Sequence, residues 1–173
     1  MRPDPCTSAR TAIMMRDFVG WQGLPAECSG QELFDITPAD LEGRPGRLLG
    51  NDFDPAVFVL LSLEGYYRPM ASFREGKLVL FDAMNPELRG GFDWLRSDLG
   101  EPAARMDWYY GTLAIAAGEW AYPERGITIF VNTEANRALH VALYYPASLE
   151  EYRNRLRPHL RKEPWPRQRS VGT

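Results

Sequence analysis

The sequence contains few of the side chains that metal centres and nucleophilic enzymes use. Its 173 residues include two cysteines, Cys6 and Cys28, and two histidines, His140 and His159. A tetrahedral zinc site would need all four, and none of them are spaced as a CxxC or HxxxH pair. We therefore expect neither a metal nor a cofactor. Two unpaired cysteines also fit a reducing compartment better than a disulfide framework.

Long apolar runs are missing as well. No stretch of about 18 apolar residues occurs, which is the length that a membrane-spanning helix needs. The first twenty residues contain Asp4 and Asp17 and have no apolar segment of signal-peptide length. We therefore interpret the chain as a cytoplasmic protein without membrane contact.

Charge is modest in total but unevenly distributed. The chain has 20 basic and 23 acidic residues, and the net charge of −3 argues against a nucleic-acid partner. Residues 151–173 hold seven basic and two acidic residues, a net +5, so residues 1–150 carry −8. An acidic body of this kind favours a basic protein partner, because opposite charges speed association.

The length corresponds to one domain, since domains commonly have roughly 150 residues. We expect residues 1–15 to be a flexible extension outside the fold, and residues 16–158 to form a single globular domain. Residues 159–173, which are basic and rich in proline, are expected to be a tail.

Helices are predicted by capping signals and by apolar spacing. Ser29 with Glu32, and Ser148 with Glu151, have the spacing of capping boxes, so a helix is expected to begin after each serine. Thr37-Pro38 interrupts or restarts the first of these helices. Residues 87–99 carry an apolar stripe at helical spacing.

Strands are predicted by alternation and turns. Residues 66–74 and 77–82 flank Glu75-Gly76, which favours a hairpin. A second hairpin is expected from the alternating residues 126–131 and 137–145. Residues 56–63 are almost continuously apolar, which is typical of a strand buried on both faces.

The two halves of the chain follow the same plan. In each half, strands end near a proline, Pro86 or Pro146, and a helix follows; the separation is about 50 to 60 residues. This predicts two degenerate copies of one helix-plus-meander unit, near residues 29–86 and 87–157. We expect an α+β fold with antiparallel strands, in two sheets or one shared sheet, and helices on one side.

A resemblance to a known family rests on the second half. The turn Leu99-Gly100-Glu101-Pro102 and the strand sequences 119–130 and 138–144 resemble small α+β modules of the beta-lactamase-inhibitor-protein-like type and related lipoprotein assembly factors. The resemblance implies a helix-and-meander fold. Members of this family are largely binding proteins, so it also implies binding in place of catalysis.

Aromatic residues crowd the expected sheet. Because alternation sends consecutive aromatic side chains to opposite faces, helices on one side would leave some of them exposed as a protein-binding surface. An enlarged core or a second covering layer is the alternative. With acidic loop residues added, the candidate binding residues are Asp52, Asp54, Tyr66, Trp108, Tyr110, Glu119, Trp120, Tyr122, Glu124 and Tyr144.

The best catalytic arrangement would join Cys28 to His140 and to a carboxylate, Asp35 or Glu119, because a thiolate nucleophile needs a neighbouring base. Spacing alone does not establish that contact. No phosphate-binding loop is present. Asp52 and Asp54 could bind a hard cation, but the residues that follow do not form an EF-hand.

We hypothesise a non-catalytic binding protein, such as an immunity protein or inhibitor that occludes the active site of a basic toxin. One alternative is a small-molecule-binding protein or enzyme with a pocket on the aromatic sheet face, lined by His140, Tyr144 and Trp120. Another is a scaffold subunit that holds a partner with its basic tail.

Overall fold

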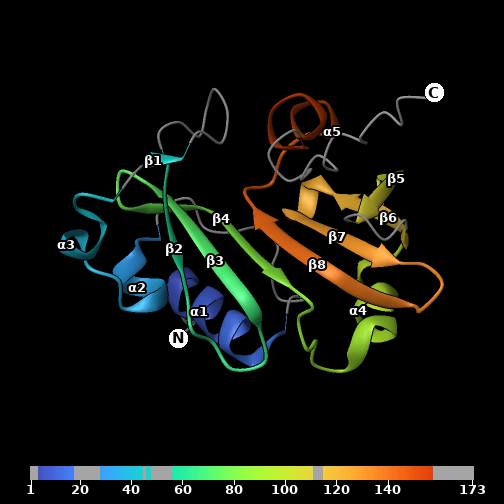
Figure 1. Cartoon of the computed structure of the whole chain (residues 1–173), viewed down its shortest axis with the longest axis horizontal. Helices are drawn as coiled ribbons and strands as arrows, with labels where there is room; N and C mark the ends of the chain where they lie inside the picture. Colours follow the sequence, from blue (N-terminus) through green and yellow to red (C-terminus); the bar gives the residue numbers. More distant parts are fainter. Residues whose placement is uncertain (1–3, 18–27, 45, 48–55, 111–114, 158–173) are drawn as a thin grey trace, which may run out of the picture.

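Within the residues that the structure describes, eight strands form one antiparallel sheet, with helices on both of its faces (Figure 1). The computed structural model describes residues 4–17, 28–44, 46–47, 56–110 and 115–157. No helix in this described part is long and apolar enough to cross a lipid bilayer. In chain order the elements are α1 (Pro5–Met15), α2 (Gly30–Phe34), α3 (Pro38–Leu41), β1 (Gly46–Arg47), β2 (Ala56–Leu60), β3 (Tyr67–Arg74), β4 (Lys77–Met84), α4 (Gly91–Leu99), β5 (Ala104–Tyr110), β6 (Ile115–Tyr122), η2 (Pro123–Arg125), β7 (Ile127–Asn132), β8 (Arg137–Tyr144), α5 (Leu149–Glu151) and η3 (Tyr152–Leu156).

The capping boxes begin helices where the sequence predicts them. The hydroxyl of Ser29 accepts from the backbone N–H of Glu32, and the Glu32 carboxylate accepts from the backbone N–H of Ser29 at 2.8 Å. This backbone hydrogen bond holds the pKa of the Glu32 carboxyl below its usual range. Ser148 begins α5 in the same way. A third box, at Thr37, begins α3, so Thr37-Pro38 restarts the helical path.

Each half of the sheet is a four-stranded meander. The strand order is β1-β2-β3-β4-β8-β7-β6-β5, so the two meanders meet through their last strands, β4 and β8. β4 begins at Lys77 and β8 at Arg137, 60 residues later. Both strands contain a bulge at the equivalent extra residue, Val79 in β4 and Leu139 in β8. The antiparallel α+β fold is confirmed, with one shared sheet built from two helix-plus-meander halves.

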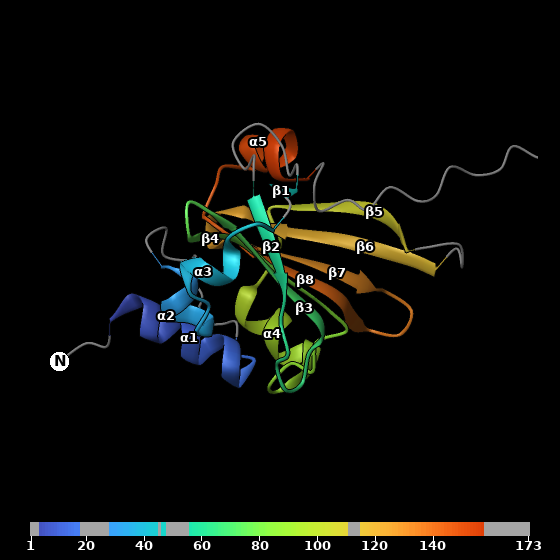
Figure 2. The same ribbon diagram turned by 60° about the vertical axis from the view of Figure 1, so that its left-hand side comes forward.

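The first face of the sheet is covered by α1, α2 and α4, which lie together on one side in Figure 2. The expected apolar stripe of α4 is buried there, as Phe92, Leu95 and Leu99. Side chains that alternate along the strands complete this core. They include Val59, Ala71, Phe73, Leu78, Phe81, Ala83, Trp120, Tyr122, Ile127, Ile129, Val131, Val141 and Leu143.

The second face carries a separate apolar cluster under α5 and η3, which Figure 2 shows on the side opposite α1 and α2. Helices were expected on one side of the sheet. The last helical segment lies on the other side because the apolar stripe of η3 packs onto strands of both halves. This cluster consists of Leu80, Ala121, Phe130, Leu139, Ala142, Tyr144, Tyr152 and Leu156.

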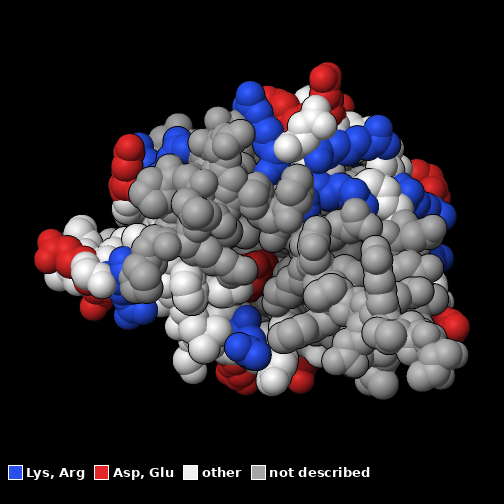
Figure 3. All heavy atoms as spheres, turned by 45° about the horizontal axis from the view of Figure 1, so that its top comes forward, with Lys and Arg blue, Asp and Glu red and all other residues white. Residues whose placement is uncertain are grey.

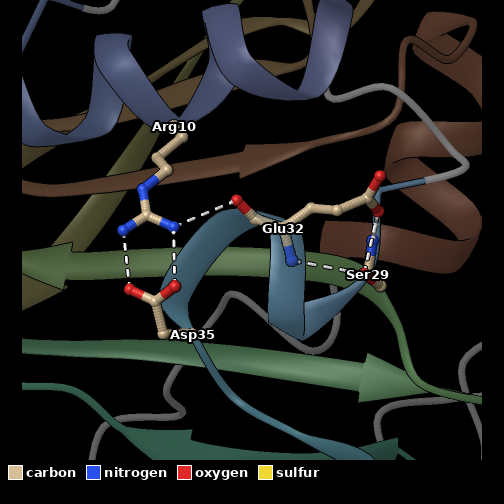
Figure 4. Close-up of polar contacts among 4 residues, drawn as sticks. All are labelled: Arg10, Ser29, Glu32 and Asp35. Carbon is tan, nitrogen blue, oxygen red and sulfur yellow. Dashed lines mark hydrogen bonds and ion pairs between the residues drawn. The ribbon is translucent and has the colours of Figure 1, made fainter.

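The expectation of a flexible extension at residues 1–15 is wrong for most of that segment. Residues 5–15 form α1, and its apolar side chains, among them Ile13, are part of the first-face core. Arg10 of α1 donates to both carboxylate oxygens of Asp35, the residue that ends α2, at 2.9 and 2.6 Å (Figure 4). α1 is therefore docked on α2 by an apolar side and by a bidentate ion pair.

The expectation of free thiols is also wrong. Cys6 of α1 and Cys28, which directly precedes the first capping box, form a disulfide with a Cα–Cα distance of 5.5 Å. Both cysteines are buried. Neither sulfur is therefore available as a nucleophile, and the bridge fastens α1 to the body of the protein.

We expect the disulfide to contribute about 3 kcal/mol to the free energy of unfolding, because it closes a loop of about 22 residues and restricts the unfolded chain. The double variant Cys6→Ser, Cys28→Ser should lose this amount in urea denaturation. A reductant should destabilise the natural protein and leave the double variant unchanged. Two titratable thiols per chain in denaturant without reductant would contradict the bridge.

Candidate functional site

The second face of the sheet holds most of the polar side chains that the fold buries. The strand register places Tyr67, Met84, His140, Phe130 and Glu119 in one row across β3, β4, β8, β7 and β6. The row crosses three regions. Glu119 lies in the covered part under η3, His140 lies at the seam between the halves, and Tyr67 lies in an open part on the first half.

The covered part contains a buried carboxylate. The side chain of Glu119 is fully buried on β6. The hydroxyl of Tyr152 donates to its Oε1 at 2.7 Å, and Nε of Arg157 lies 3.1 and 3.0 Å from its two oxygens. The carboxylate is thus matched by one cation and one hydroxyl, which is what a buried charge requires.

The local structure of η3 explains why two residues reach Glu119 together. Residues 152–156 form a π-helical turn, in which the N–H of Arg157 donates to the carbonyl of Tyr152. Because π-helical hydrogen bonds join residues five apart, Tyr152, Leu156 and Arg157 share the side that faces the sheet. Leu156 and Tyr152 supply the apolar contact, and Arg157 supplies the charge.

A second polar contact lies beside the first. The hydroxyl oxygens of Thr128 and Tyr144 are 2.8 Å apart and share a hydrogen bond. The rings of Tyr144 and Tyr152 stack with 5.6 Å between their centroids. Burial raises the pKa of both phenols far above the usual range. Both hydroxyls therefore keep their protons, and the cluster positions η3 on the sheet.

The seam lies where β4 meets β8. His140 is buried and stacks on Phe130 with 4.9 Å between ring centroids. Its Nε2 lies 3.9 Å from Oδ1 of Asp82, whose side chain is 13% exposed. Asp82 therefore brings a carboxylate to the edge of the open part.

The open part of the second face consists of Phe58, Leu60, Tyr67, Met70 and Met84. Leu60 and Tyr67 are each 57% exposed and Phe58 is 37% exposed. They lie in neighbouring rows, because Leu60 pairs with Met70 and Tyr67 pairs with Met84. The expectation that residues 56–63 are buried on both faces is therefore wrong: β2 buries Val59 on the first face and exposes Phe58 and Leu60 on the second.

Most of the aromatic candidates belong to the core. Trp120 and Tyr122 lie on the first face, where Phe92 packs on Trp120 and the Tyr122 hydroxyl donates to the carbonyl of Gly100 at 3.0 Å. Tyr66 donates to the carbonyl of Ile13 at 2.6 Å. These three residues, and Tyr144 under η3, are corrections to the predicted binding surface, because helices on both faces cover the aromatic rings.

The acidic residues predicted to bind a partner differ in how exposed they are. Glu119 was expected at the surface and is instead the buried carboxylate under η3. Glu124 is exposed on η2. Asp52 and Asp54 lie outside the described residues, as do the side chains of Trp108 and Tyr110 on β5.

The catalytic alternative loses its nucleophile, because Cys28 is in a disulfide. His140 and Glu119 lie on the same face, but each is buried and held by other side chains. Asp35 is engaged on the helical side by Arg10. Among the described residues, no three His, Cys, Asp or Glu side chains gather in a way that could hold a metal ion.

No family model matches the chain, and no curated protein matches it significantly. Among solved structures, the chain is similar to a DUF4309 family protein (YjgB) from Bacillus subtilis, with 15% sequence identity and a TM-score of 0.38. That match covers 80% of this chain and 98% of the Bacillus protein.

Sequence reasoning missed Tyr152 and Arg157 as partners of a buried charge. A signal was present, since Glu119 occupies the same alternating face as Ala121 on a strand with no other charge nearby. Its partners lie 33 and 38 residues further along the chain, so only the fold shows them.

Removing the cation from this cluster should be costly. We expect Arg157→Gln to lower the free energy of unfolding by about 3 kcal/mol, because it leaves Glu119 buried without a counter-charge. The exposed neighbour Arg153 provides a matched control, and Arg153→Gln should change stability by less than about 0.5 kcal/mol. Urea denaturation of both variants measures the difference. Equal stabilities would mean that the ion pair has no net effect.

Proposed function

We propose that this chain is a non-catalytic binding protein that attaches to another protein through the open part of its second face. The observation that supports the proposal is the exposure of Phe58, Leu60 and Tyr67 side by side on neighbouring strands. Single exposed apolar residues are common on protein surfaces, but groups of large ones are typical of interaction sites. Tyrosine, phenylalanine and methionine are also enriched in interfaces.

A rigid platform strengthens this proposal. The open part lies on strands whose other face is packed under α1 and α2. Its side chains therefore project from a fixed backbone, which lowers the entropy lost on binding. The partner would bury apolar surface against Leu60 and Tyr67 at low conformational cost.

We propose that the partner is basic and that binding occludes its active site, as an inhibitor or immunity protein does. Two features support this choice. Residues 1–150 carry a net charge of −8, which would steer a basic protein toward this chain. Asp82, whose side chain is 13% exposed, adds negative charge to this face beside Met70 and Met84.

The compartment is part of the proposal. The sequence favoured the cytoplasm because it lacks long apolar runs and because its cysteines were interpreted as free. A buried disulfide instead favours an oxidising compartment, since cytosolic thiols are kept reduced. We therefore propose that the chain meets its partner outside the cytoplasm.

The experiment compares two arginine substitutions at exposed apolar positions. Leu60→Arg should weaken partner binding by at least about tenfold, because it places a buried cation in the interface against a basic protein. Met15 is 47% exposed on α1, on the helical side, so Met15→Arg should leave binding unchanged. Cross-linking and mass spectrometry with the natural protein identify the partner, and titration calorimetry then gives the affinities.

Two outcomes would contradict the proposal. If both variants bind the captured protein equally, the interface lies elsewhere. If the natural protein binds no other protein under oxidising conditions, the chain does not act by protein binding.

A further inference from the structure

A second surface feature lies at the other end of β4, away from the open part. It is a pocket of about 380 Å³ between the β3–β4 hairpin and the last helical segment. Val79, Tyr145, Ala147 and Leu156 contribute apolar surface to it. The volume lies within the range of small-ligand sites, which are commonly apolar with a few convergent polar groups.

The bulge in β4 and the turn that follows β8 explain why a pocket forms there. Val79 is the extra residue of the β4 bulge, and a bulge changes the direction of the strand and of the side chain beside it. The chain leaves β8 at Tyr144 and turns through Pro146 into α5. The hairpin and the helical segment therefore diverge, and the pocket lies between them.

The charges that line the pocket are mainly positive. Arg74 comes from the end of β3 and Arg155 from η3, and both line the pocket. Glu151 also lines it: its carboxylate accepts from the backbone N–H of Ser148 at 2.8 Å, and this hydrogen bond, together with the nearby charge of Arg155, lowers the pKa of that carboxyl. The pocket therefore holds two positive charges and one negative charge. Figure 3 shows several Lys and Arg side chains around α5 and the neighbouring end of the sheet, with acidic side chains among them.

We propose that this pocket binds an apolar organic carboxylate. The apolar walls at Val79 and Leu156 would take the hydrocarbon part, and the guanidinium groups of Arg74 and Arg155 would take the carboxylate. Planar guanidinium forks match a carboxylate with two parallel hydrogen bonds, so arginine selects this group well. A free small acid and the carboxyl terminus of a peptide share this chemistry.

Titration calorimetry can test the site with defined probes. N-acetylphenylalanine represents the free acid, and an acetylated tripeptide that ends in phenylalanine represents the chain terminus. Each probe is compared with its carboxamide, which keeps the shape and removes the charge. We expect at least one of the two acids to bind saturably. The carboxamide of the acid that binds more tightly should bind at least about tenfold more weakly than that acid.

The variants locate the binding. Arg74→Gln and Arg155→Gln should each weaken binding of the more tightly bound acid by about tenfold. Arg153→Gln is the matched control, because Arg153 lies in the same π-helical turn and does not line the pocket. Circular dichroism and urea denaturation check that each variant is folded.

The relative affinities of the two acids distinguish the two kinds of ligand. Tighter binding of the tripeptide acid identifies a peptide terminus as the ligand, and tighter binding of N-acetylphenylalanine identifies a small free acid. The proposal is overturned if neither acid binds, if acids and carboxamides bind equally, or if Arg153→Gln weakens binding as much as Arg74→Gln.

Discussion

The antiparallel pairing of β4 with β8 is the constraint on which the rest of the structure depends. It joins the two meanders into one sheet, and the register places Phe81 opposite Leu143 at the centre of the first-face core. Because side chains alternate along a strand, a slip of one residue would turn this core toward the second face. The register also decides what lies at the seam, since it sets Asp82 beside Ala142 and Met84 beside His140.

A buried charge fixes how the chain ends on this sheet. Removing the Glu119 carboxylate from water is unfavourable, and Arg157 with the Tyr152 hydroxyl offsets that cost. An apolar helix could slide along an apolar face, whereas a carboxylate accepts these donors in one arrangement. The ion pair therefore ties η3 to β6, where its apolar side chains cover the second-face cluster.

Local features of the fold could be predicted from the sequence, and nonlocal ones could not. Capping boxes begin helices at Ser29 and Ser148, and Glu75-Gly76 forms a turn. In each case the residues that interact lie within four positions of one another, so the local sequence is enough to predict the structure. The disulfide of Cys6 joins positions 22 residues apart, and its formation depends on how α1 docks. The sequence wrongly predicted an exposed surface for most of the aromatic rings for the same reason. Alternation shows which side chains share a face, but it does not show which helix covers that face.

The two halves show how a duplicated unit acquires different surfaces. At a separation of 60 residues, Met70 corresponds to Phe130 and Met84 to Tyr144, and each pair occupies the second face. The residues of the second half are fully buried under η3, while the methionines of the first half are partly exposed. In the part of the chain that the structure describes, the C-terminal helical segment covers the second face of the second half. The second-half positions are therefore core, whereas the equivalent methionines of the first half lie beside the exposed Leu60 and Tyr67.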